Sequence, residues 1–120
     1  MGKLEQEFAA YRERMNARIL AEDNRVIKRV YSVDSLAYAE DAGELPKQTR
    51  ELLGLVASLV LRCDDCVKYH VKEARAAGNS RKAIVEAMSI GLVVGGTIVV
   101  PHLRRAIEFL DDVDGTTPAA

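Results

Sequence analysis

The stretch RELLGLVASLVLRCDDCVKYHVKEA, residues 50–74, decides the fold of this chain. Its first half, ELLGLVASLVL, is apolar on nearly all sides and is interrupted only by Gly54, which is typical of a buried helix. Its second half carries apolar residues and a histidine at steps of three and four, which indicates another helix with one packed face. Together the two halves predict an antiparallel helical hairpin over residues 47–61 and 64–77 that turns near Arg62.

Helical patterns continue toward the N-terminus. Ser32 is a good N-cap and Gly43 is a good residue to follow a helix, so a short helix is expected from Ser32 to Gly43. Pro46 then fits the first turn of the helix that opens the hairpin. An earlier helix is predicted by an apolar stripe at steps of three and four, made of Leu4, Phe8, Tyr11, Met15 and Ile19.

Caps and breakers divide the segment after the hairpin turn. Asp64 or Asp65 can cap the second helix of the hairpin, and Gly78 is expected to end it. Ser80 can cap a further helix, because an apolar pattern follows it directly.

The last part of the chain is predicted to be a helix followed by a tail. Gly95 and Gly96 are expected to break the apolar run, and the helical pattern resumes over residues 103–110. Residues 111–120 are polar and end in TTPAA, so a frayed polar tail is expected there. The chain is thus predicted to be all-α, with one helical domain over residues 1–110.

Composition narrows the function classes. A chain of 120 residues with 48% hydrophobic and 29% charged residues predicts one globular domain. Its 17 basic and 18 acidic residues lack the basic surplus of a nucleic-acid-binding protein.

The most apolar run, residues 90–100, is too short to span a membrane, and no secretory signal is recognisable, so a cytoplasmic protein is expected. This run and the apolar helix at 52–61 predict surface that a second copy covers, hence a homo-oligomer.

The motif CDDCVKYH carries the chemistry. Cys63, Cys66 and His70 are separated by three and then four residues, which places them on one helix face. Backbone N–H groups at a helix N-terminus stabilise a thiolate, and His70 can accept or return the proton of Cys66. Asp64 and Asp65 oppose this effect, because nearby negative charge disfavours a thiolate.

Hairpin geometry adds Glu51 to this set. Glu51 lies 11 residues before the turn and faces a position near Glu73. His70 is three residues short of that position, an axial offset of about 4.5 Å that a glutamate side chain can cover. Glu51 is therefore expected to orient His70, which in turn serves Cys66.

Each of these residues has another interpretation. The two cysteines and His70 can bind zinc, with His102 as a fourth ligand. Alone, Glu51 is a first-turn charge that suits the helix dipole, and His102 is a packing or interface residue. A thioredoxin-like fold is disfavoured because a long unbroken helical segment, not a strand, precedes Cys63.

The sequence resembles the AhpD-like alkylhydroperoxidase / carboxymuconolactone decarboxylase superfamily. The resemblance rests on Glu51, eleven residues, Cys63, two residues, Cys66, three residues and His70, and it covers about residues 30–110. It implies a helical bundle that assembles into trimers or hexamers, with the CxxC motif at a helix N-terminus.

The resemblance also implies a thiol-dependent peroxidase without a cofactor or a metal. Cys66 is then the peroxidatic residue, Cys63 the resolving residue, and His70 with Glu51 the proton relay. The substrate is a hydroperoxide, and an external dithiol or thiol protein supplies the electrons. The family's peroxidases carry a histidine where this chain has Asp65, while the decarboxylase branch generally lacks the cysteine pair. Two alternatives remain: a general disulfide oxidoreductase, and a zinc-stabilised or purely structural assembly protein.

Overall fold

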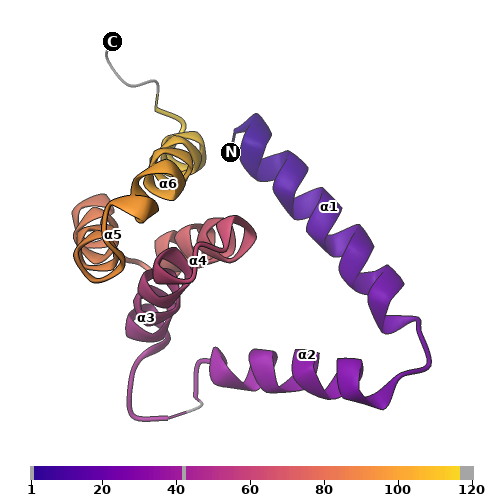
Figure 1. Cartoon of the computed structure of the whole chain (residues 1–120). Coiled ribbons are helices and arrows are strands. Elements are labelled where there is room, and N and C mark those ends of the chain that lie inside the picture. The colour runs from indigo at the N-terminus through magenta and orange to yellow at the C-terminus, as the bar shows by residue number, and fades with distance from the viewer. Residues whose placement is uncertain (1, 42, 117–120) are drawn as a thin grey trace.

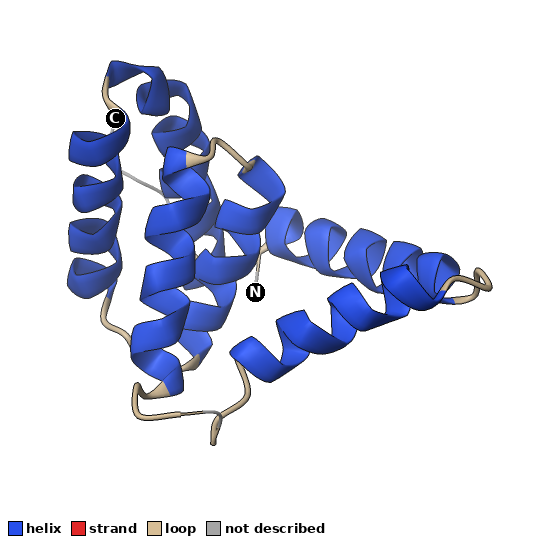
Figure 2. Ribbon diagram, turned by 60° about the horizontal axis from the view of Figure 1, so that its bottom comes forward, coloured by secondary structure: helices blue, strands red, loops and turns tan. Residues whose placement is uncertain are grey.

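The computed structural model describes residues 2–41 and 43–116, and within them it is built of helices (Figure 1). Figure 2 shows helices and loops and no strand in this part of the chain, so the all-α prediction is confirmed. In chain order the elements are α1 (Lys3–Leu20), α2 (Arg25–Ala37), α3 (Lys47–Val60), α4 (Asp64–Ala76), α5 (Arg81–Gly95), the short 3₁₀ helix η1 (Thr97–Val99) and α6 (Val100–Asp114).

The core lies among the last four α-helices. Helix α3 packs against α4 and α5, and α4 packs against α6. Phe8 of α1 adds to this core, since its ring meets the ring of Phe109 edge-on with centroids 5.6 Å apart. The buried apolar residues are Leu55, Leu59, Val67, Val71, Ala74, Ile84, Met88, Val99, Ala106, Phe109 and Leu110.

The hairpin between α3 and α4 is present as predicted, and its turn follows the Schellman pattern. Arg62 adopts the left-handed conformation, with φ of 59°, and its N–H donates to the carbonyl of Leu59. The next N–H, that of Cys63, donates to the carbonyl of Ser58 at 3.0 Å. This turn therefore fixes the backbone of the first cysteine.

The expectation that α3 is buried on all sides is wrong for the single chain. Leu55 and Leu59 are fully buried, but Leu53 is 54% exposed, and Leu61, which directly follows the helix, is 76% exposed. Only one side of α3 faces α4 and α5, so the apolar residues on its other side remain at the surface.

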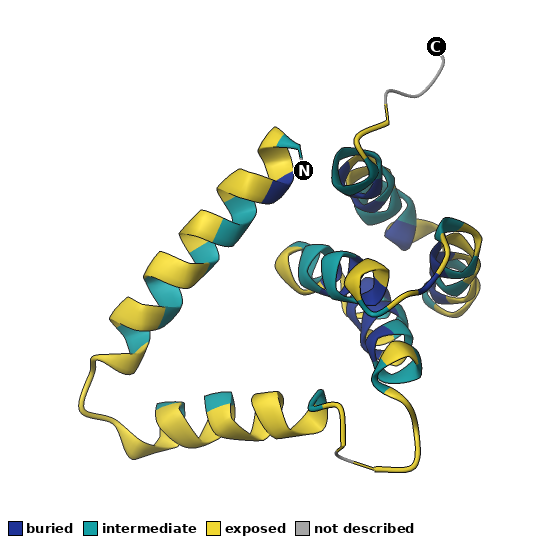
Figure 3. Cartoon of the chain, turned by 180° about the vertical axis from the view of Figure 1, so that it is seen from behind, coloured by how far each residue is buried: buried dark blue, intermediate teal, exposed yellow. Residues whose placement is uncertain are grey.

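The second helix differs from its prediction. Helix α2 begins at Arg25 and ends at Ala37, whereas Ser32 and Gly43 were the expected limits. Asn24 is the N-cap, because its side chain accepts a hydrogen bond from the N–H of Ile27, and this cap starts the helix earlier. Figure 3 shows that α2 is exposed over most of its surface.

The end of the chain also differs. Ser80 caps α5 as expected, and Gly96 breaks the chain with φ of 82°. However, α6 continues to Asp114, so the frayed tail expected from residue 111 is wrong for residues 111–114. Contacts with other helices hold this turn: Arg81 binds the carboxylates of Asp111 and Asp114. Residues 117–120 lie outside the described residues.

Hydropathy gives no sign of a membrane span in the described part of the chain, because none of its helices combines the necessary length with the necessary apolar character.

Candidate active site

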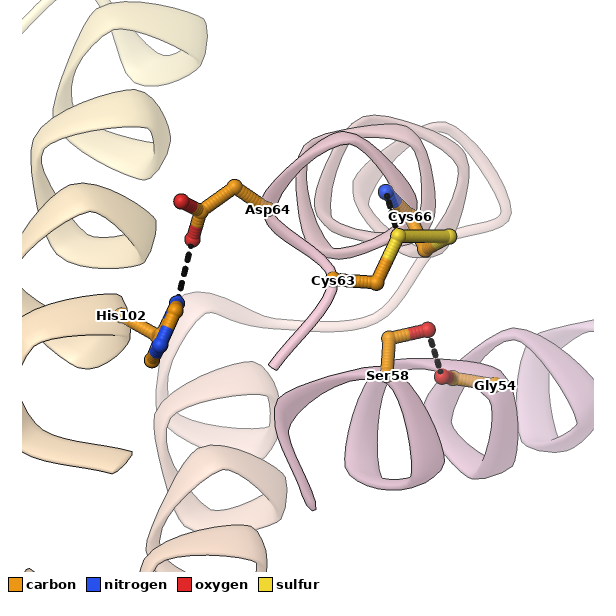
Figure 4. The surroundings of a disulfide bond; sticks show 6 residues. All are labelled: Gly54, Ser58, Cys63, Asp64, Cys66 and His102. Atoms are coloured by element: carbon orange, nitrogen blue, oxygen red, sulfur yellow. Dashed lines mark hydrogen bonds and ion pairs between the residues drawn. A yellow bond between two sulfur atoms is a disulfide. The ribbon is translucent and has the colours of Figure 1, made fainter. Parts of the chain in front are cut away.

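The cysteine pair lies at the start of α4. Cys63 and Cys66 form a disulfide, and Cys63 is the N-cap residue of the helix (Figure 4). The Sγ atom of Cys63 accepts a hydrogen bond from the N–H of Cys66 at 3.4 Å. The cap is thus Cys63 itself, and not Asp64 or Asp65 as expected. Because the unpaired N–H groups of the helix end point at this site, a thiolate formed here is stabilised.

The two sulfur-bearing residues differ in exposure. Cys66 is exposed, whereas Cys63 is half-buried and has its backbone held by Ser58. Ser58 lies beside the disulfide in Figure 4, and its hydroxyl donates to the carbonyl of Gly54 at 2.6 Å. An attacking group that comes from solvent therefore reaches Cys66 more easily than Cys63.

Glu51 and His70 meet across the hairpin, as its geometry predicts. Oε1 of Glu51 lies 2.9 Å from Nδ1 of His70, and the glutamate side chain is completely buried. The other oxygen, Oε2, accepts a hydrogen bond from Nζ of Lys47 at 2.6 Å. Both carboxylate oxygens are therefore engaged.

The partners of Glu51 keep it ionised. Burial raises the pKa of Glu51, but the hydrogen bonds from His70 and Lys47 and the charge of Lys47 outweigh burial and leave the pKa below its ordinary value. An ionised carboxylate can only accept, so Nδ1 of His70 carries the proton in this pair. Nε2 of the neutral imidazole is then the atom that can take a proton.

Nε2 faces α3 and the end of α2. A Cβ placed on Gly54 would lie 2.7 Å from Nε2 of His70 and 2.6 Å from the hydroxyl oxygen of Tyr38. Gly54 is therefore needed here because any side chain would occupy the space of both groups. This close approach of His70 and Tyr38 explains why a glycine interrupts the apolar sequence of α3.

Two tyrosines enclose the imidazole. The ring centroid of Tyr38 lies 5.0 Å from that of His70, and the centroid of Tyr69 lies 5.3 Å from it. Burial, followed by the charges of Glu51 and Asp34, raises the pKa of Tyr38, so its hydroxyl stays protonated. These contacts restrict the motion of the ring and limit its exposure to 8% of the residue surface.

Sequence reasoning missed Lys47, Tyr38 and Tyr69. The spacing of Lys47 and Glu51, four residues apart on one helix, was a signal for the first of them. No local signal identified Tyr38, because the connection between α2 and α3 brings it to the site. Arg50 holds this connection by donating to the carbonyls of Leu45, Ala37 and Glu40.

The zinc interpretation fails on the placement of its donors. His70 faces Glu51, whereas His102 of α6 faces Asp64, with 2.8 Å between Nδ1 and Oδ1. Among the described residues no three histidine, cysteine or acidic side chains gather in a way that suits a metal ion. The two histidines therefore do not converge with the cysteines on one point.

Two curated relatives resemble parts of this chain. An uncharacterized protein of the cox locus of Paracoccus denitrificans is 32% identical over 73 residues, which is 61% of this chain and 66% of that protein. An uncharacterized protein of Cupriavidus necator is 27% identical over 73 residues, 61% of this chain and 65% of that protein. The match thus spans just under two thirds of the length of each relative.

Solved structures extend the similarity to nearly the whole chain. A Thermotoga maritima protein is 44% identical, with a TM-score of 0.87 over 92% of this chain and 95% of the other. A second Thermotoga maritima structure, with 42% identity and a TM-score of 0.84 over 95% and 99% of the two chains, is a carboxymuconolactone decarboxylase family protein for which involvement in an antioxidative response has been suggested. A family member from Legionella pneumophila, at 17% identity and a TM-score of 0.79 over 91% and 96% of the two chains, shares the fold.

The model of the carboxymuconolactone decarboxylase family matches residues 26–109. This range contains α3, α4 and α5, both cysteines and the Glu51–His70 pair. Because the match covers well over half of the chain, this protein belongs to the carboxymuconolactone decarboxylase family.

Proposed function

We propose that this protein is a thiol-dependent peroxidase that reduces hydroperoxides with the Cys63–Cys66 pair. The observation that carries the proposal is the disulfide at the N-terminus of α4, one helical turn before a histidine that a buried glutamate orients. A thiolate at a helix N-terminus with a proton acceptor on the same helix is the arrangement that thiol chemistry requires.

The proposed reaction has three steps. The Cys66 thiolate attacks one oxygen of the hydroperoxide, the O–O bond breaks, and the alcohol leaves after taking a proton. Cys66 is then a sulfenic acid, and the Cys63 thiol attacks its sulfur to form the disulfide and release water. Finally, an external dithiol or thiol protein returns the pair to two thiols by disulfide exchange and is itself oxidised.

His70 serves the first step in this proposal. Its Nε2 takes the proton of the Cys66 thiol and returns a proton to the leaving alkoxide. Glu51 fixes the tautomer through Nδ1 and stabilises the imidazolium that forms. Cys66 is assigned the first attack because it is the exposed cysteine and lies four residues before His70.

The comparisons support an antioxidative role of this kind. The Thermotoga maritima relative with the suggested antioxidative involvement is similar over nearly all of the chain. The presence of two cysteines at the motif favours thiol chemistry over lactone decarboxylation, as the sequence resemblance implies. Asp65, in place of a histidine, is expected to reduce the rate because its negative charge lies next to Cys66.

A thiol titration tests the proposal directly. The reduced protein is treated with one equivalent of an organic hydroperoxide, and free thiols are counted before and after. Loss of both thiols together with release of one equivalent of alcohol is expected. Retention of both thiols, with the protein folded, would overturn the peroxidase proposal.

A general disulfide oxidoreductase is the second candidate. The exposure of Cys66 favours it as well, because an exposed disulfide sulfur is open to exchange with another thiol. Catalytic peroxide consumption with a supplied dithiol distinguishes the two, since the oxidoreductase exchanges disulfides but consumes no peroxide.

We also propose that the protein acts as a homo-oligomer. Exposed apolar side chains on α2, α3 and α5 support this proposal, among them Val26 at 72%, Leu53 at 54% and Val93 at 80% exposure.

A further inference from the structure

The carboxylate next to the first cysteine is held by α6. Oδ1 of Asp64 lies 2.8 Å from Nδ1 of His102, and Oδ2 accepts a hydrogen bond from Nε of Arg105 at 2.9 Å. Nη2 of Arg105 lies 3.2 Å from the same Nδ1. We call these three residues, Asp64, His102 and Arg105, the Asp64 clamp.

The clamp joins two helices at the redox site. His102 and Arg105 are three residues apart on α6 and share one face, so they reach Asp64 together. Figure 4 shows the Asp64 side chain directed toward His102, while the disulfide lies on the other side of the α4 backbone. The carboxylate is thus turned away from the sulfur atoms.

The clamp also offsets the negative charge of the Asp64 carboxylate. Asp64 is the first residue of α4, directly after Cys63, and its negative charge disfavours a thiolate there. The guanidinium of Arg105 supplies one positive charge to the same carboxylate. Burial raises the pKa of Asp64, but the hydrogen bonds from His102 and Arg105 outweigh it and lower the pKa, so the carboxylate stays ionised and paired.

We propose that His102 and Arg105 are positioning residues that set the reduction potential of the Cys63–Cys66 pair by holding and neutralising Asp64. The inference rests on the redox activity of this pair in the proposed function. Reduction of the disulfide produces thiols that ionise, so any group that stabilises a thiolate stabilises the reduced form and raises the potential. Without Arg105, the charge of Asp64 acts on the thiolate and lowers the potential.

The test is a charge cycle on the reduction potential. Wild type, Arg105→Gln, Asp64→Asn and the double variant are equilibrated at neutral pH with reduced and oxidised glutathione, and the dithiol fraction is measured. One disulfide and two glutathione molecules give one dithiol and one glutathione disulfide, which is a two-electron exchange. Arg105→Gln is expected to lower the equilibrium constant for reduction about three- to tenfold, because the clamp is partly exposed and solvent screens it. A tenfold change corresponds to about 30 mV.

The variant Asp64→Asn distinguishes an effect of charge on the potential from a purely structural effect of the clamp. Asp64→Asn removes the negative charge and is expected to raise the equilibrium constant, whereas the double variant is expected to return close to wild type. A purely structural clamp would shift both single variants in the same direction, since each breaks the same contact. Shifts of the same sign, or an unchanged potential in folded Arg105→Gln, would overturn the inference.

A matched control uses the neighbouring arginine. Arg104 is exposed on the same helix, so Arg104→Gln removes an equal charge without touching the clamp. A shift as large as that of Arg105→Gln would contradict a specific role of the clamp. If Arg105→Gln does not fold, the reduction potential of Asp64→Asn tests the inference by itself. Only a potential above that of the wild type agrees with it. Retention of both thiols when the reduced wild type is treated with hydroperoxide would instead overturn the proposed function.

Discussion

The buried carboxylate of Glu51 and the imidazole of His70 form a hydrogen bond of 2.9 Å across the hairpin, although 19 residues separate them in the sequence. The glutamate side chain is fully buried, and its second oxygen is bound by Lys47. Such a buried carboxylate persists only because both oxygens have charged or polar donors. The pair thus fixes one imidazole tautomer and leaves Nε2 as the basic atom.

Glu51→Gln is expected to slow the reaction of the reduced protein with hydroperoxide by about 100-fold. Glutamine keeps the size of the side chain and one hydrogen bond, but it loses the charge that stabilises the imidazolium. The cysteine retains its place at the helix N-terminus, so the loss should fall near the lower end of the range for acid–base assistance. Single-turnover kinetics with the reduced protein measure the effect.

The matched comparison for this variant is His70→Ala. It should lose at least as much rate, and the double variant should lose much less than the product of the two effects, because both residues act through one proton path. Full additivity, or wild-type rates in Glu51→Gln, would show that Glu51 serves only the structure of α3.

The Glu51–His70 contact was predictable because both residues lie on regular helices joined by a short turn. In an antiparallel hairpin, residues at equal distances from the turn face each other, so their spacing in the sequence alone determines which residues come into contact. The same reasoning cannot locate Tyr38, which reaches His70 through an irregular connection that Arg50 holds by backbone carbonyls. The predicted start of α2 was wrong because the local sequence contains two residues that can cap a helix, Asn24 and Ser32. The structure uses Asn24.

The two cysteines should give different products with peroxide. In Cys63→Ser, Cys66 is expected to stop at a sulfenic acid, because no second thiol can condense with it. In Cys66→Ser, peroxide consumption should be lost almost completely. A dimedone-type probe and mass spectrometry identify the modified residue. Labelling of Cys63 in Cys66→Ser, without labelling of Cys66 in Cys63→Ser, would reverse the assigned roles.

Gly54→Ala should disturb the site through one methyl group. The added Cβ would lie 2.6 Å from Cε1 of His70 and 2.6 Å from the Tyr38 hydroxyl, which forces both rings to move. We expect a loss of about 1–3 kcal/mol in the free energy of unfolding, together with a slower peroxide reaction. Combining it with Tyr38→Phe removes one of the two clashes and should recover part of the stability. Wild-type melting and wild-type rate in Gly54→Ala would contradict the packing described for His70.

Acid is expected to weaken the fold through three paired carboxylates. Burial raises the pKa of Glu51, Asp64 and Asp114, but hydrogen bonds and cationic neighbours outweigh it and lower all three. A folded pKa below the unfolded value, about 4.3 for Glu and about 3.9 for Asp, gives stability that is present above the unfolded value. That stability is lost as the pH falls from about 4.5 through the folded values.

Urea unfolding from pH 7 to pH 3 tests this pH dependence. The free energy of unfolding should be flat above about pH 5 and should fall below it. In Arg81→Gln, which removes a partner of Asp114, the fall should be smaller, since that carboxylate then has less stabilisation to lose. A curve that rises toward low pH would contradict the assignment.

One face of α2 is expected to lie at a contact between copies of the chain. Val26, Val30, Val33 and Leu36 recur at steps of three and four and are each more than 60% exposed, at 72%, 61%, 64% and 65%. A stripe of this kind is the core-facing pattern of a helix, yet no other part of residues 2–41 and 43–116 covers it. Sedimentation at micromolar concentration should therefore give a mass that is a multiple of 13.2 kDa.

The role of this stripe is tested by adding one charge at two places on the same helix. Val30→Glu puts a carboxylate into the stripe and should shift the protein to smaller species, because an unpaired charge resists burial at an interface. Ser32→Glu adds the same charge on an exposed position outside the stripe and should leave the mass unchanged. If both variants keep the wild-type mass, the contact between copies uses another surface, such as the exposed side of α5. A wild-type mass near 13 kDa would exclude the oligomer altogether.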